Sequence, residues 1–185
     1  MEVADAAVLI AAAVPAHGKV WADLGAGDGI FSRALVSLLG SGVQVHAVDR
    51  EPGVVRLARS NGIVPLHADF RKPLTLPELD GALFANSMHF VDADSQAAVL
   101  RAVALHVRPN GVIVVVEYED RAASRSVPAP ISFTRLVTLA REASLGAPRI
   151  VGTRRSAFGG TMYAACMSAR VEQLGEARRA SGLDL

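Results

Sequence analysis

A run of alternating glycines behind a single acid is the part of this sequence best suited to chemistry. Asp23 stands near the end of the apolar run 20–24 and is followed by Gly25, Gly27 and Gly29. A strand, a tight glycine turn and a helix start bring backbone amides close to a ligand, and this arrangement holds cofactors that contain adenosine. The sequence therefore predicts a site for such a cofactor at this turn.

A second acid follows at the distance that this kind of site needs. The run 43–48 is typical of a strand, and it ends in Asp49. A carboxylate at the tip of a second strand can accept hydrogen bonds from both hydroxyls of a ribose, each worth about 1.5–3 kcal/mol because the acceptor is charged. The third small residue comes one position early, at Gly29, and Ile30 occupies the place where the dinucleotide fingerprint has a small residue.

The order of these motifs resembles that of the class I S-adenosylmethionine-dependent methyltransferases of the methyltransferase-11/25 type. The matching positions are Asp23, Gly25, Gly27 and Gly29 for the first motif, Asp49 and Asp69 for the acids after the second and third strands, and residues 83–90 and 108–118 for the fourth- and fifth-strand signatures. The segments 127–133 and 158–163 are similar to one uncharacterised branch of the family. The resemblance covers about residues 18–120.

The resemblance implies S-adenosyl-L-methionine as the cofactor and S-adenosyl-L-homocysteine as its product. It implies that Asp23 binds the ammonium group or orients the turn, and that Asp49 holds the ribose. It further implies that Asp69 accepts from the adenine amino group while Phe70 donates its amide or packs beside the ring. Asn86 is expected along the methionine arm. The remaining cofactor-binding candidates are Gly25, Ala26, Gly27, Arg50 beside the adenine, and Ser87.

The acceptor side is expected just beyond the fourth and fifth strands. The reaction implied is in-line displacement at the methyl carbon, for which no metal is required. His89 is the candidate general base, because it follows the fourth strand and titrates near neutral pH. Tyr118 and Glu119 are the other candidates for contact with substrate, and His17 could cover the cofactor.

The elements that position these residues alternate between strand and helix. Strands are expected over 19–24, 43–48, 63–68, 79–86, 112–118, 149–153 and 161–167, and helices over 4–14, 30–39, 52–60, 95–107 and 133–145, the fourth of them capped by Asp94. Such alternation predicts an α/β, Rossmann-like, doubly wound and mostly parallel sheet. The last two strands are expected to form an antiparallel hairpin at its edge, which completes the seven-stranded class I methyltransferase fold.

One domain of 185 residues is expected, with 51% hydrophobic residues and a net charge of +1. Residues 1–17 are expected to form a lid helix, 18–120 the cofactor-binding core, 121–168 a substrate-side helix and edge hairpin, and 169–185 a tail. The balanced charge does not favour a nucleic-acid partner. A single cysteine excludes an internal disulfide, and no apolar run is long enough to span a bilayer, so a cytoplasmic protein is expected.

The leading hypothesis is a methyltransferase acting on O, N or C of a small molecule. A small lid also allows a pocket completed by a partner chain, hence a possible homodimer. A methyltransferase of the same fold acting on protein or RNA stays open, because residues 121–125 and the pair 154–155 carry arginines. A nicotinamide oxidoreductase is disfavoured by Ile30, and a non-catalytic cofactor-binding module is a further alternative.

Overall fold

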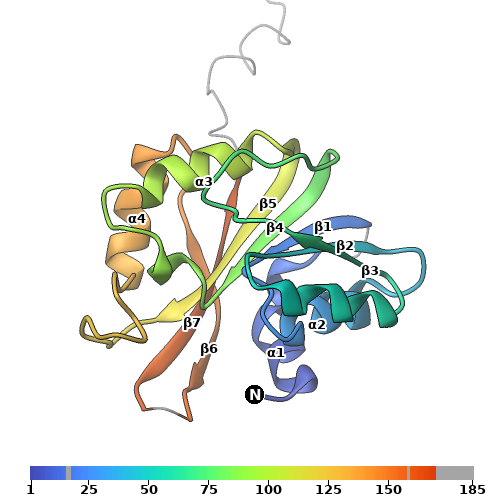
Figure 1. The fold of residues 1–185 in the computed structure, drawn as a ribbon. Coiled ribbons are helices and arrows are strands. Elements are labelled where there is room, and N and C mark those ends of the chain that lie inside the picture. The colour runs from blue at the N-terminus through green and yellow to red at the C-terminus, as the bar shows by residue number, and fades with distance from the viewer. Residues whose placement is uncertain (16–17, 158, 170–185) are drawn as a thin grey trace, which may run out of the picture.

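The computed structural model describes residues 1–15, 18–157 and 159–169. They form a seven-stranded sheet in the order β3-β2-β1-β4-β5-β7-β6 (Figure 1). The strands are β1 (Val20–Leu24), β2 (Gln44–Asp49), β3 (Ile63–His67), β4 (Leu79–Ala85), β5 (Val107–Tyr118), β6 (Arg149–Arg155) and β7 (Thr161–Ser168). The first five are parallel, and β7 runs antiparallel to both β5 and β6. The predicted fold class and the C-terminal edge hairpin are thus confirmed.

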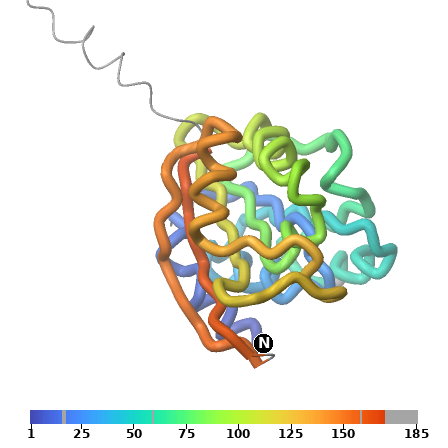
Figure 2. The backbone as a smooth tube through the Cα atoms, turned by 90° about the vertical axis from the view of Figure 1, so that its left-hand side faces the viewer, coloured from blue at the N-terminus to red at the C-terminus, as the bar shows by residue number. Residues whose placement is uncertain are grey.

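Helices cover both faces of the sheet (Figures 1 and 2). The helices are α1 (Val3–Ile10), α2 (Ile30–Leu39), α3 (Gln96–Ala104) and α4 (Phe133–Glu142), with 3-10 turns η1 (Ala11–Ala13), η2 (Pro52–Arg59) and η3 (Met88–Phe90). α3 and α4 pack with one face of the sheet into one apolar core, and α1 and α2 with the other face into a second. A sheet covered on both faces explains why β4 is buried along its whole length and why residues 112–116 of β5 are all Val or Ile.

The first helix is fastened to the far end of the sheet. The Asp5 carboxylate lies 2.8 Å from the Arg154 guanidinium on β6. Gly152 passes so close to the end of α1 that a Cβ there would lie 2.3 Å from the Leu9 carbonyl oxygen. α1 therefore packs against α2 and β6, and its expected role as a lid stays a prediction.

Several boundaries differ from those predicted. The helix predicted over 52–60 is a 3-10 helix that begins at Pro52. Asp94 does not cap α3: the cap position is Ser95, which makes no side-chain cap hydrogen bond. β5 begins at Val107 rather than at residue 112, because Val107 pairs with Leu79 before the register shifts at Gly81. α4 ends at Glu142, and Ser144 follows with a left-handed backbone (φ 60°).

Candidate functional site

A cavity of about 290 Å³ opens at the carboxyl edge of the parallel strands. β1 lies between β2 and β4, so the strand order reverses there, and ligands of open α/β sheets bind at this point. Segments that follow β1, β2, β3 and β4 all contribute to its wall. The lining residues are Gly25, Gly27, Asp49, Arg50, Glu51, Asp69, Phe70, Arg71, Asn86, Ser87 and Phe90.

The glycine turn can be built only without side chains. Gly25 (φ 83°), Gly27 (φ 53°) and Gly29 (φ 77°) have left-handed backbones. A Cβ on Gly25 would also lie 2.4 Å from the Ser87 Cβ. The amides of Gly25 and Ala26 donate to the Val48 carbonyl at 2.8 and 3.1 Å, which fastens the turn to β2.

Asp49 links this turn to the tip of β2. Its Oδ2 accepts from the Gly27 amide at 2.7 Å, and its Oδ1 accepts from the Glu51 amide at 2.9 Å. Two backbone donors therefore fix the carboxylate, which is 9% exposed. A carboxylate has about four acceptor positions, so two remain for a ligand that brings neighbouring hydroxyls.

A second cavity, of about 200 Å³, lies beside the first and shares Gly25, Gly27 and Asn86 with it. Asp23, Ala26 and Met1 are among its other lining residues. Among the described residues, Asp23 Oδ1 and Asn86 Oδ1 are buried and have no hydrogen-bond partner. Two unpartnered acceptors on one small cavity favour a ligand with several N–H donors, such as an ammonium group.

A hydrogen bond fixes the Asp23 carboxylate, and Asn86 has an unusual backbone conformation. Ser32 on α2 donates its hydroxyl to Asp23 Oδ2 at 2.6 Å. Burial raises the pKa of the Asp23 carboxyl from its ordinary 3.8 to about 6, although the Ser32 hydrogen bond opposes the shift. Asn86 has a left-handed backbone (φ 54°), a strained state that clusters at binding sites.

Asp69 lines the larger cavity but is already engaged. Its Oδ1 accepts from the Arg71 amide and Nε at 3.0 and 2.9 Å, and its Oδ2 accepts from Arg71 Nε and Nη2 at 3.1 and 2.6 Å. These bonds lower the pKa of Asp69 to about 2. Three N–H groups of Arg71 thus take up most of the carboxylate's acceptor positions, and a ligand amino group at Asp69 must share the carboxylate with Arg71.

Two further side chains shape the cavity between β1 and β4. Ser87 donates its hydroxyl to the Leu24 carbonyl at 2.6 Å, across the end of β1. Phe70 packs edge-on against the buried Phe84 of β4, with ring centroids 5.6 Å apart. Both residues are fixed by neighbouring strands, so this wall of the cavity is built before a ligand arrives.

His89 lies behind this cavity rather than in its wall. It is 2% exposed, its Nδ1 is 2.7 Å from Glu117 Oε2, and its amide donates to Glu117 Oε1 at 3.2 Å. Its ring lies 4.4 Å from that of Phe90 and 6.1 Å from that of Tyr118. Phe90 does line the cavity and is 46% exposed. The role of His89 as a base stays a prediction.

The segment from Val127 to Phe133 is fastened over this region. Ala129 donates its amide to the His89 carbonyl at 3.0 Å, and the Tyr163 hydroxyl donates to the Ile131 carbonyl at 2.9 Å. Glu119 Oε2 accepts from the Phe133 amide at 2.7 Å, at the start of α4. Glu119 thus ties the end of β5 to α4, whereas Tyr118 lies under the Arg121 guanidinium, 4.7 Å from the ring centroid.

The structure therefore brings most of the predicted residues together. Gly25, Gly27, Asp49, Arg50, Asp69, Phe70, Asn86 and Ser87 line the larger cavity, and Asp23 and Ala26 line the smaller one. Sequence reasoning missed Glu51, Arg71 and Phe90 in the wall. The position of Arg71 two residues after Asp69 was the available signal for its ion pair. His17 lies outside the described residues.

The described residues include neither a candidate metal centre nor a membrane-spanning helix. No group of three or more His, Cys, Asp or Glu residues in these ranges could hold a metal ion. Of the helices in the described part of the chain, none combines the length and the apolar character that crossing a bilayer requires.

Part of the chain is similar to a known protein family. Residues 22–111 match the family model described as a methyltransferase domain. No curated protein sequence matches the chain significantly.

Solved structures share the fold at low identity. The Burkholderia thailandensis 1,6-didemethyltoxoflavin N1-methyltransferase, solved with its substrate and S-adenosylhomocysteine, is 20% identical, with a TM-score of 0.70 over 91% of this chain and 78% of that one. The CcbJ methyltransferase from Streptomyces caelestis is 20% identical, with a TM-score of 0.67 over 90% and 89%. Human N-acetylserotonin methyltransferase, solved with S-adenosylmethionine, is 22% identical, with a TM-score of 0.66 over 89% of this chain and 51% of its own. The chain likewise spans 53% of mitomycin 7-O-methyltransferase.

Proposed function

We propose, from the premise that residues 22–111 belong to the methyltransferase-domain family, that this protein transfers a methyl group from S-adenosyl-L-methionine to an O, N or C nucleophile of a small molecule. One observation carries the proposal. The glycine turn separates two adjoining cavities, one with a fixed carboxylate and the other with two buried acceptors that lack partners. S-adenosylmethionine combines a ribose diol and an ammonium group, which match these two sets of acceptors.

The residues present fit this cofactor in a definite orientation. The adenosine would occupy the larger cavity, with its ribose hydroxyls on Asp49 and its base beside Phe70 and Asp69. The ammonium group would lie in the smaller cavity, against Asp23 Oδ1 and Asn86 Oδ1. Because a Cβ on Gly25 would strike Ser87, only glycine lets the backbone approach the ligand between these two ends.

When bound, the cofactor supplies a methyl carbon whose bond to sulfur breaks as its bond to the acceptor forms. The protein's main task is then to hold the acceptor atom about 3–3.5 Å from that carbon and in line with it. Asn86, Ser87 and Phe90 border the cavity at the end of β4. We assign them the positioning of the methionine arm and of the acceptor.

His89 is proposed as the base for acceptors that must lose a proton. With Nδ1–H donated to Glu117, Nε2 is the nitrogen that accepts a proton, and the buried carboxylate stabilises the imidazolium that results. His89 does not line the cavity, so this role requires the Phe90 ring, which contacts it, to turn aside. Rotation of a partly exposed side chain is a rapid event on the timescale of catalysis.

The size of the acceptor is proposed from the site and from the neighbours. Segment 127–133 is fastened by hydrogen bonds to His89, Glu119 and Tyr163, on the side of the site where the Phe90 ring contacts His89. Arg154 of the arginine pair 154–155 is already paired with Asp5 on α1. Three of the four neighbours named above, the toxoflavin, N-acetylserotonin and mitomycin enzymes, carry small-molecule substrates in their names. These observations support a small-molecule acceptor over a protein or an RNA. We also propose that a second copy of the chain completes the acceptor pocket in a homodimer.

The experiment is transfer of a labelled methyl group from S-adenosylmethionine to a panel of small phenols, amines and activated carbon acids. We expect product with at least one acceptor, and loss of turnover with unchanged cofactor affinity in His89→Asn when the acceptor is a phenol. The matched control is His46→Asn, which removes a partly buried imidazole from β2 that lines neither cavity of the site. Weaker cofactor binding in His89→Asn, with no selective effect on turnover, would refute the role of His89 as a base.

A further inference from the structure

A third cavity, distinct from the two described above, lies between α3 and the loop that follows β3. Its volume is about 530 Å³, within the range of small-molecule sites. Its walls include the apolar side chains of Leu74, Val99 and Val103, of which the last two are 7% and 2% exposed. We call it the α3 cavity; its full lining is Phe70–Leu74, Ser95, Ala98, Val99, Ala102, Val103, Leu105 and His106.

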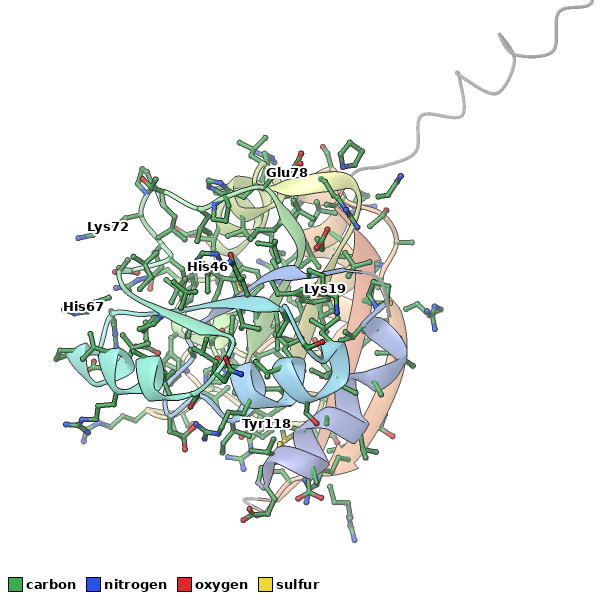
Figure 3. All side chains as sticks on the ribbon, turned by 90° about the vertical axis from the view of Figure 1, so that its right-hand side faces the viewer. Lys19, His46, His67, Lys72, Glu78 and Tyr118 are labelled. Atoms are coloured by element: carbon green, nitrogen blue, oxygen red, sulfur yellow. The ribbon has the colours of Figure 1, made fainter. Side chains whose placement is uncertain are left out.

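The charged residues that line this cavity are basic. They are Lys72 and Arg71, the latter paired with Asp69, and no acidic residue lines it among those that the structure describes. Lys72 extends outward from the loop after β3, on the same side of the molecule as His67 (Figure 3). An apolar floor with a cationic border suits a ligand with an apolar body and one negative group, because each part then meets a complementary surface.

The α3 cavity and the larger cavity of the cofactor site share a wall. Phe70 and Arg71 line both of them. Arg71 donates to both oxygens of the Asp69 carboxylate through its amide, Nε and Nη2, and its side chain is 39% exposed. The Arg71 guanidinium therefore lies between the Asp69 carboxylate on one side and the α3 cavity on the other.

We propose that the α3 cavity binds an amphipathic small-molecule carboxylate and that this binding is coupled to the cofactor site through Arg71. A carboxylate in the α3 cavity accepts hydrogen bonds from the Arg71 guanidinium and draws it away from Asp69. Asp69 then no longer shares its acceptor positions with the guanidinium and accepts more fully from the adenine amino group, so the cofactor binds more tightly. The coupling is reciprocal, because each ligand must change the affinity of the other by the same factor.

Octanoate is the probe for the binding site, and octanamide is its uncharged match. Isothermal titration should show octanoate binding to the full chain, with octanamide weaker by at least about threefold because it lacks the charge. Ala102→Trp fills the cavity from an exposed position on α3 and should abolish binding. Leu38→Trp places the same ring on α2 and should leave binding unchanged. Absence of octanoate binding, or binding that survives Ala102→Trp, would overturn the site.

The coupling is tested with S-adenosylhomocysteine. Saturating octanoate should tighten its binding by about two- to fivefold, the value of one partly exposed ion pair, and Arg71→Gln should remove this effect. Ala102→Trp should bind S-adenosylhomocysteine as the unchanged protein does, but without a response to octanoate. Octanoate binding with no change in S-adenosylhomocysteine affinity would overturn the coupling. Failure of S-adenosylhomocysteine to bind at all would instead refute the proposed function, and the octanoate titration would still decide the site.

Discussion

Replacement of Asp49 by alanine tests the cofactor site at its most constrained residue. The carboxylate is fixed by the amides of Gly27 and Glu51 at 2.7 and 2.9 Å, and its free acceptor positions face the larger cavity. Two charge-assisted bonds to ribose hydroxyls are worth about 1.5 kcal/mol or more each, or about 3 kcal/mol together. We therefore expect Asp49→Ala to weaken S-adenosylhomocysteine binding at least about tenfold, and more than a hundredfold if both bonds are lost.

The assay must separate lost binding from lost folding, because the same carboxylate holds the glycine turn. Isothermal titration gives the affinity, and urea unfolding gives the stability of each variant without ligand. The matched control is Asp120→Ala, which removes an exposed carboxylate just beyond β5 and outside the cavity. If Asp49→Ala folds and binds with unchanged affinity, the assignment of the ribose to Asp49 is wrong.

Three more predictions follow from particular contacts. Gly25→Ala should abolish S-adenosylhomocysteine binding by titration, since its Cβ would lie 2.4 Å from the Ser87 Cβ at φ 83°; retained affinity would show that the turn does not approach the ligand. Asp23 binds its proton more tightly in the folded protein, where its pKa is about 6, than in the unfolded chain, where it is 3.8. The free energy of unfolding should therefore fall by roughly 3 kcal/mol as the pH rises from about 4 to about 6. Urea titrations should show that Asp23→Asn removes this fall. Tyr163→Phe leaves the Ile131 carbonyl without its 2.9 Å donor and should cost about 1–3 kcal/mol, with faster amide exchange in 127–133; an unchanged exchange rate would mean that other contacts hold this segment.

The strands and their end residues could be predicted from sequence because each has a local signature. Alternating strands and helices fix a parallel sheet, and the carboxyl ends of its strands must lie at one edge, which is why Asp49, Asp69 and Asn86 meet at the larger cavity. The predicted bounds of α2 match the observed ones, because Gly29 and Gly40 flank an amphipathic helical pattern. These inferences need only neighbouring residues.

What was missed depends on contacts between distant segments. The pairing of His89 with Glu117 joins residues 28 apart, and no local pattern shows that the imidazole turns away from the cavity. The early start of β5 depends on the pairing of Val107 with Leu79 across the sheet. The 3-10 form of residues 52–59 is long for such a helix and likewise depends on distant contacts, because Val54 and Leu57 pack with Ala47 of β2 and Ile63 of β3.

Equilibrium binding of S-adenosylhomocysteine to the unaltered protein tests the central claim most directly. The two cavities and their unpartnered acceptors predict one binding site with a dissociation constant in the micromolar range, or about −8 kcal/mol, measured by isothermal titration. Binding of this strength, lost in Gly25→Ala, is the result we expect. No heat of binding for either S-adenosylhomocysteine or S-adenosylmethionine, from protein shown to be folded, would contradict the account.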